Sequence, residues 1–133
     1  MKIYKFVLIL MLLVGVLGIS PVSAQAEVPG EIKTAIRNGS SGDLARYFNT
    51  TVEIGLDGDK SSYSKTQAEF VLKSFFSKNA PDGFEFDHQG SSDRGQRYAI
   101  GTYNSKGVSY RVFVVVKQAN GGFLIDTIDF TKK

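Results

Sequence analysis

The stretch from Ser64 to Asn79 carries the strongest helical periodicity of the chain and constrains its fold more than any other feature. Its apolar residues recur at i, i+3, i+4, i+7 and i+8, which places them in one stripe along a helix. They are Ala68, Val71, Leu72, Phe75 and Phe76. Ser64 and Gln67 have the spacing of a capping box, and Pro81 prevents the helix from continuing. The sequence therefore predicts one long helix whose apolar stripe the rest of the chain must cover.

Two shorter helices and a strand are predicted before this helix. Residues Pro29 to Asn38 form the first, with apolar residues on one side. Asp43 is the expected N-cap of the second, whose helically spaced apolar residues are Leu44, Tyr47 and Phe48. Thr51 to Leu56 alternates apolar with polar residues, which predicts a strand, and residues 57–60 form its turn.

Four strands separated by turns rich in Gly, Asn or Ser are predicted after the long helix. They are Gly83 to Gln89, Arg97 to Tyr103, Val108 to Lys117 and Phe123 to Phe130. The chain is therefore expected to be an α+β domain, with two short helices and one long helix packed in a curved antiparallel sheet.

The strand from Val108 to Lys117 contains the run Phe113 to Val116, which is apolar on both faces. A sheet with one wet face alternates cleanly, so something must cover the outer face. A homodimer formed through this face is one expectation. The alternative is that the sheet curls enough for its own helices and loops to cover both faces.

The first 24 residues have the pattern of a secretory signal peptide. Lys2 and Lys5 precede an apolar run from Phe6 to Ile19, and Val22-Ser23-Ala24 fits a cleavage site. The run is shorter than the roughly 20 residues that a membrane-spanning helix needs. We expect cleavage, a single domain over residues 25–133, and export to the periplasm or beyond without a membrane anchor.

Charge and cysteine content exclude several classes of function. The net charge of +3 includes Lys2 and Lys5 of the leader, so the mature domain is close to neutral and no nucleic-acid partner is expected. The absence of cysteine excludes a thiolate nucleophile, a cysteine zinc site and a lipoprotein anchor. Residues 57–61 begin like a calcium loop, but Ser62 and Ala68 stand where glycine and glutamate are required. No metal or other cofactor is expected.

The order of elements resembles the cone-shaped nuclear transport factor 2-like fold. Four stretches are similar to a family of small exported Bacteroidota proteins known only as a domain of unknown function. They are Pro29 to Ile32, Tyr63 to Glu69, His88 to Ser92 and Tyr98 to Thr102. The resemblance implies the cone fold and export, and it implies no catalytic residues. Cone-shaped domains host enzymes, binding modules and assembly units alike.

The aromatic content of the strands and the long helix favours a non-catalytic binding domain for a small apolar or amphipathic ligand or a protein partner. The expected ligand-binding residues are Phe76, Phe86, His88, Tyr98, Tyr110 and Arg111. Arg111 lies in the middle of a strand, where it either binds an anion or forms a cross-strand salt bridge with Asp126 or Asp129.

The alternative function is an isomerase or dehydratase centred on His88 or Asp126. His88 is the single histidine, and in the alternating pattern it shares a face with Phe84 and Phe86. A histidine in this place is more often hydrogen-bonded at the rim of the cavity for structural reasons. Acidic partners for it and tyrosines for a polar pocket are present at unspecific spacing. They are Asp87, Asp126 and Asp129, and Tyr98, Tyr103 and Tyr110.

Overall fold

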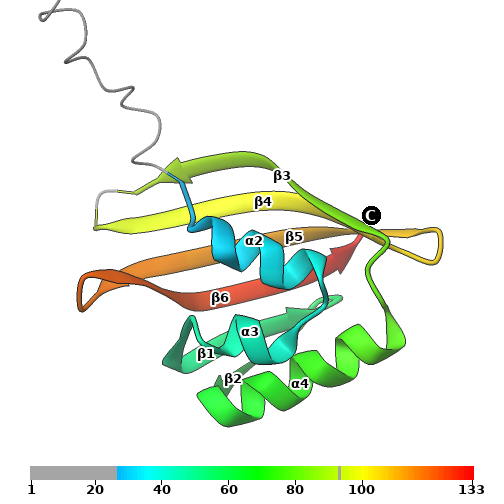
Figure 1. The fold of residues 1–133 in the computed structure, drawn as a ribbon, viewed down its shortest axis with the longest axis horizontal. Coiled ribbons are helices and arrows are strands. Elements are labelled where there is room, and N and C mark those ends of the chain that lie inside the picture. Colours follow the sequence, from blue (N-terminus) through cyan, green and yellow to red (C-terminus); the bar gives the residue numbers. More distant parts are fainter. Residues whose placement is uncertain (1–26, 93) are drawn as a thin grey trace, which may run out of the picture.

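The computed structural model describes residues 27–92 and 94–133, in which a six-stranded sheet curves around three helices. All three helices lie on one face of the sheet (Figure 1), which we call the inner face; the opposite one is the outer face. The predicted leader and its cleavage site lie outside the described residues. No helix among residues 27–92 and 94–133 is both long enough and apolar enough to cross a membrane.

The three helices are α2 (Gly30–Arg37), α3 (Ser41–Ala45) and α4 (Lys65–Lys78). The strands are β1 (Phe48–Leu56), β2 (Asp59–Ser64), β3 (Gly83–Ser91), β4 (Gln96–Ser105), β5 (Val108–Ala119) and β6 (Gly122–Lys132). Their order across the sheet is β2-β1-β6-β5-β4-β3. Strands β3 to β6 form an antiparallel meander, and β1 joins it parallel to β6. The predicted α+β architecture, with a long helix followed by a meander, is confirmed.

Helix α4 begins and ends where the sequence predicts. Ser64 Oγ accepts the N–H of Gln67 at 3.3 Å, and Gln67 Oε1 accepts the N–H of Ser64 at 3.3 Å, which completes the capping box. Most of the apolar stripe is buried against the sheet and α3, with Val71 half-buried at its margin. Phe70 points away from the stripe and is 64% exposed.

Helix α3 is shorter than predicted, and its cap is a different residue. Ser40 Oγ accepts the N–H of Asp43 at 3.2 Å, so Ser40 is the N-cap and Asp43 lies in the first turn. The helix ends at Ala45, and Phe48 begins β1 beside Ile125 of β6. This pairing with a strand distant in the sequence overrides the local helical spacing that the sequence prediction used.

Strand β2 is missing from the sequence prediction, which places a turn at residues 57–60. The turn consists of Asp57 and Gly58, with φ of 52° and 91°, and this is the left-handed geometry of a two-residue hairpin. Residues Asp59–Ser64 then pair with β1. Because β2 is a polar edge strand with almost every side chain exposed, it has no apolar alternation for a sequence pattern to detect.

Ion pairs between α2 and β3 tie the first helix to the edge of the sheet. Lys33 Nζ and Arg37 Nη2 each lie 2.7 Å from a carboxylate oxygen of Glu85. The hydrogen bond from Lys33 is the main cause that holds the pKa of Glu85 below its usual value. A carboxyl with a lowered folded-state pKa stabilises the fold above its unfolded pKa, and this contribution is lost as the pH falls through the folded value.

Candidate functional site

The interior of the cone, between α4 and the sheet, is filled by aromatic side chains. Phe75 lies at the centre of this cluster, and the centroids of four neighbouring rings are 4.5–5.9 Å from its own. These rings are Phe76, Tyr103, Tyr110 and Phe130. All five side chains are buried. The geometry is that of a packed core and leaves this part of the cone without room for a ligand.

The two buried phenols in this cluster are used to close the end of α4. Tyr103 donates a hydrogen bond to the backbone oxygen of Asn79, and Tyr110 donates one to Asn79 Oδ1 at 3.1 Å. Asn79 Nδ2 in turn donates to the carbonyl oxygen of Phe75 at 3.1 Å. Burial raises the pKa of Tyr103 far above its usual value, so the phenol stays protonated as a donor. These hydrogen bonds hold the C-terminal end of α4 against the sheet, so the two phenols have a structural role.

The outer face of the sheet carries three rows of side chains across β4, β5 and β6. Directly paired residues of neighbouring strands point to the same face, so the rows follow from the register. They are Thr102, Arg111 and Thr131; Ile100, Phe113 and Asp129; and Tyr98, Val115 and Thr127. No helix of the described part of the chain covers this face (Figure 1). Phe113 is 37% exposed there.

A hollow of about 310 Å³ lies within the first two rows and extends toward β2. We call it the Arg111 hollow, and its lining residues are Lys60, Ile100, Arg111, Phe113, Asp129 and Thr131. It combines an apolar wall with three charged groups. Lys60 Nζ lies 3.5 Å from Asp129 Oδ2, and Thr131 donates a hydrogen bond to Asp129 Oδ1 at 2.7 Å.

Two glycines on the outer face make room for side chains that lie across neighbouring strands. A Cβ at Gly55 would lie 2.7 Å from Asp129 Oδ2, so its absence lets this carboxylate lie over β1. A Cβ at Gly90 would lie 2.5 Å from the hydroxyl oxygen of Tyr98, which lies over β3 in the same way. The absence of side chains at these two positions therefore determines where Asp129 and Tyr98 lie on the outer face.

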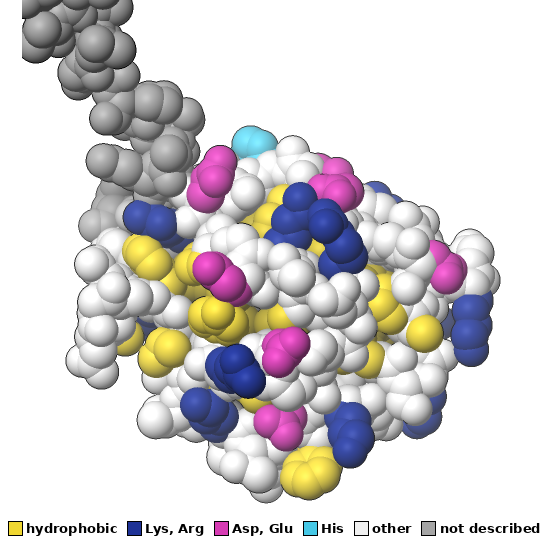
Figure 2. All heavy atoms as spheres, in the orientation of Figure 1, with side chains coloured by type: hydrophobic (Ala, Val, Ile, Leu, Met, Phe, Trp, Pro, Cys, Tyr) yellow, Lys and Arg dark blue, Asp and Glu magenta, His cyan; other side chains and the backbone are white. Residues whose placement is uncertain are grey.

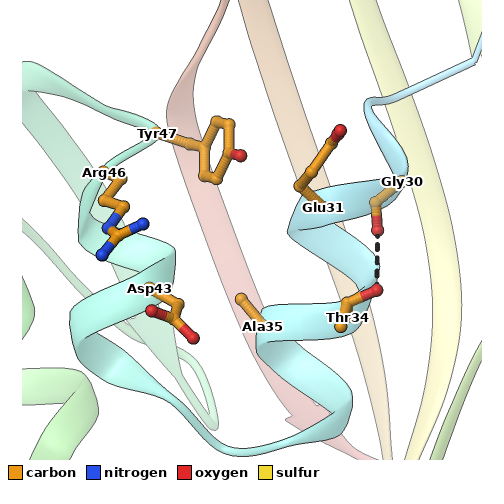
Figure 3. Close-up of a pocket in the computed structure, with 7 residues that line it drawn as sticks. All are labelled: Gly30, Glu31, Thr34, Ala35, Asp43, Arg46 and Tyr47. Atoms are coloured by element: carbon orange, nitrogen blue, oxygen red, sulfur yellow. Dashed lines mark hydrogen bonds between the residues drawn. The ribbon is translucent and has the colours of Figure 1, made fainter.

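A second hollow, of about 520 Å³, lies between α2 and α3 (Figure 3). Tyr47 and Asp43 project from the α3 side toward α2, where Glu31 and Ala35 line the opposite wall. Glu31, Asp43 and the third charged lining residue, Arg46, are all exposed. The helix-bearing face around this hollow has Lys or Arg and Asp or Glu side chains interspersed over it (Figure 2). The hollow is lined by two carboxylates and one guanidinium, and neither sign of charge dominates the face around it.

Comparison with known proteins shows where this arrangement belongs. Residues 29–131 match the model of the family described as Domain of unknown function (DUF4783). The chain belongs to this family. A DUF4783 protein from Bacteroides ovatus superposes with a TM-score of 0.76 and 30% identity, covering 81% of this chain and 97% of the other. A DUF4783 protein from Bacteroides fragilis superposes with a TM-score of 0.76 and 27% identity, covering 80% of this chain and 100% of the other.

More distant structures share the fold of the DUF4783 domain. A nuclear transport factor 2-like protein of unknown function from Shewanella baltica has a TM-score of 0.60 at 8% identity, covering 78% of this chain and 86% of the other. That likeness is one of fold alone. The family and the cone-shaped fold expected from the sequence are thereby confirmed. No curated protein matches the chain.

His88 of this DUF4783 domain lies on the outer face, and the prediction that it shares a face with Phe84 and Phe86 is wrong. A bulge between Phe86 and His88 shifts the register, so that Phe86 pairs with Gly101 and His88 with Ile100. The extra residue turns the histidine out of the cone. His88 is exposed, and its ring centroid is 6.3 Å from that of Tyr98.

The expected salt bridge between Arg111 and Asp126 or Asp129 is not formed. Asp129 pairs with Lys60, and Asp126 Oδ2 lies 3.2 Å from Lys117 Nζ. The register is the cause, because Arg111 faces Thr102 and Thr131 across the sheet. Asp129 lies in the next row, and Asp126 lies at the register shift between β5 and β6. Within the described residues, no carboxylate lies within 4.0 Å of the Arg111 guanidinium.

The six expected ligand-binding residues do not converge on one site. Phe76 and Tyr110 are buried in the aromatic cluster, and Phe86 is half-buried beside Phe84 on the inner face of β3. His88, Tyr98 and Arg111 share the outer face. Among the weak catalytic candidates, His88, Tyr98 and Asp126 are likewise on the outer side, away from the interior phenols of Tyr103 and Tyr110.

Sequence reasoning missed four of the six residues that line the Arg111 hollow, which are Lys60, Ile100, Phe113 and Thr131. The sequence could have predicted Phe113 as a neighbour of Arg111, because it lies two residues away and therefore on the same face of the strand. Ile100 was harder to predict as a neighbour of Arg111, since this requires the register between β4 and β5. Lys60 could not have been predicted, because it reaches the hollow from β2, which the sequence pattern does not predict. No group of three metal-ligating side chains was found in residues 27–92 and 94–133.

Proposed function

We propose that this protein is an exported, non-catalytic domain that binds a small amphipathic ligand on the outer face of its sheet. One observation carries the proposal: the Arg111 hollow places exposed apolar atoms of Phe113 beside charged groups, while the interior of the cone is packed. Ligand sites in proteins typically combine an apolar wall with a few polar groups in this way.

Two further features support the proposal. The rings of His88, Tyr98 and Phe113 follow one another across the outer face, with neighbouring centroids 6.3 Å apart in each case. This row of rings extends the apolar surface beyond the hollow toward β3. Export is supported by the leader pattern of residues 1–24, which is the only basis for that part of the proposal.

Binding of the amphipathic dye 8-anilinonaphthalene-1-sulfonate tests the proposed surface, because its fluorescence reports exposed apolar sites. Replacing Phe113 by asparagine removes the main exposed ring of the hollow. We expect dye binding to weaken about fivefold or more, since a ring of this size contributes more than 1 kcal/mol when a ligand covers it. The measurement is a fluorescence titration of the folded variant.

Phe70→Asn is the matched control. Phe70 is more exposed than Phe113, but it lies on α4, away from the outer face. We expect this change to leave the affinity for the dye unaltered. Equal losses in the two variants would show that the dye responds to any exposed ring, and the assignment of binding to the outer face would be withdrawn.

A second copy of the chain is the second candidate occupant of the outer face. The exposed ring of Phe113 on a face that no described helix covers favours this occupant, because an exposed apolar patch often marks an interface. If this candidate is correct, sedimentation velocity will show a dimer that Phe113→Asp dissociates and Phe70→Asp does not. A monomer at the highest soluble concentration would eliminate the dimer.

A further inference from the structure

The charges in the Arg111 hollow do not balance. Asp129 is 13% exposed and has both carboxylate oxygens engaged, one by Lys60 and the other by Thr131. Arg111 is exposed and has no carboxylate partner among the described residues. The hollow therefore has a net charge of one positive unit. The uncompensated charge is on the Arg111 guanidinium, whose donors are free to bind an added anion.

The groups around Arg111 favour an anion over a cation. Thr102, which faces Arg111 on β4, accepts a hydrogen bond from Lys133 Nζ at 2.9 Å and donates one to Asp87 at 2.7 Å. Lys133 and Asp87 thus offset each other next to the guanidinium. A cation entering the hollow would meet the like charges of Lys60 and Arg111, and the single acid there already has a partner on each oxygen.

The next row defines the rest of the ligand. Ile100 and Phe113 face each other across β4 and β5 beside Arg111, and both line the hollow. A guanidinium binds a planar carboxylate through two parallel hydrogen bonds, and the aliphatic and aromatic walls accept an apolar body. The volume of about 310 Å³ is at the small end of ligand pockets.

We propose that the Arg111 hollow binds a monocarboxylate with an apolar body, with the carboxylate on Arg111 and the body on Phe113 and Ile100. This inference rests on the proposed function and names the chemical class of its ligand. A single negative charge neutralises the hollow, whereas a dianionic phosphate monoester would leave an excess of negative charge in it.

Three ten-carbon probes that differ only in head group test the inference: decanoate, decanol and decylammonium, each below its micelle-forming concentration. Chemical shifts of backbone amides in ¹H–¹⁵N spectra locate the binding, and their titration gives the affinity. We expect decanoate to bind tightest and decylammonium to bind weakest. We also expect decanoate to shift the amides of β4, β5 and β6 around the hollow.

Arg111→Gln should weaken decanoate binding about tenfold or more and leave decanol binding unchanged, because a charged hydrogen-bonded partner is lost. Arg111→Lys keeps the charge without the planar fork and should retain part of the affinity. Arg46→Gln is the matched control, since Arg46 is also an exposed arginine but lines the hollow between α2 and α3. Unchanged amide shifts of core residues will confirm that each variant is folded.

Each other outcome overturns a defined part of the inference. If decanol binds the outer face as tightly as decanoate, or Arg111→Gln has no effect, the carboxylate assignment is wrong and the proposed surface survives. If Arg46→Gln weakens binding as much as Arg111→Gln, the effect is one of net charge and the assignment to Arg111 is withdrawn. If none of the probes shifts outer-face amides, both the inference and the proposed function are wrong.

Discussion

Replacing Phe130 by alanine is expected to lower the free energy of unfolding by about 3–5 kcal/mol. The ring is fully buried, and its centroid lies 4.5 Å from that of Phe75 and 5.5 Å from that of Tyr103. Truncation leaves a cavity that the surrounding rings cannot refill without leaving their rotamers. Since domains of this size are stable by about 5–15 kcal/mol, the change removes a large part of the total. Urea unfolding followed by far-ultraviolet circular dichroism measures it.

Phe70→Ala is the reference for this prediction. Phe70 is 64% exposed on α4, and its truncation should change the free energy of unfolding by no more than about 0.5 kcal/mol. A loss below about 1 kcal/mol for Phe130→Ala would mean that the interior is not packed as described. The search for a ligand site would then return to the inside of the cone.

Gly101→Ala is expected to destabilise the fold by about 1–3 kcal/mol. A Cβ at this position would lie 2.5 Å from the backbone oxygen of Glu85 and 2.9 Å from a ring carbon of Phe84. The first neighbour is main chain of β3 and cannot rotate away, so β3 and β4 must separate locally. Thermal unfolding should show a lower midpoint, by roughly 4–8 °C for each kcal/mol in a domain of about 100 residues.

Gly83→Ala on the same pair of strands is the matched control. A Cβ at Gly83 would have no neighbour within 4 Å, and its φ is not positive. The substitution should be neutral or slightly stabilising, because alanine loses less chain entropy on folding than glycine. Equal destabilisation by the two changes would show that the close approach of β3 is not what makes a side chain at position 101 unfavourable.

The parts of the fold that could be predicted are those with a strong local signal. Ser64 and Gln67 define the start of α4 by a contact within one turn, and the period of Leu72, Phe75 and Phe76 defines its buried side. The meander was predictable because its strands are alternating or continuous apolar segments, and turns rich in Gly or Asn separate most of them. These signals depend on neighbours in the chain and survive without knowledge of the tertiary structure.

The parts that could not be predicted depend on distant partners. Phe48 satisfies the spacing of a helix, but its pairing with Ile125 on β6 places it in a strand. Strand β2 exists because β1 offers it hydrogen bonds, while its own side chains are polar and exposed. Neither contact leaves a trace in the local sequence pattern.

The candidate site was harder to predict than the fold, because it required the face of the sheet on which each side chain lies as well as the position of each strand. A single inserted residue in β3 moved His88 from the predicted inner face to the outer face. Tyr98 and Tyr103 are an odd number of residues apart on β4, so they point to opposite sides, and this separation was visible in the sequence. The approach of Lys60 and Asp129 to Arg111 required the order of the strands across the sheet.

The parallel pairing of β1 with β6 governs when the domain can close. Strand β1 pairs with β6, the last of the six described strands, so Phe48 can meet Ile125 only after the four intervening strands have been synthesised. Contacts of such long range make folding slow and late. For the export that we propose from the leader pattern, such late closure would favour translocation, because an unfolded chain passes through a narrow pore more readily than a folded one.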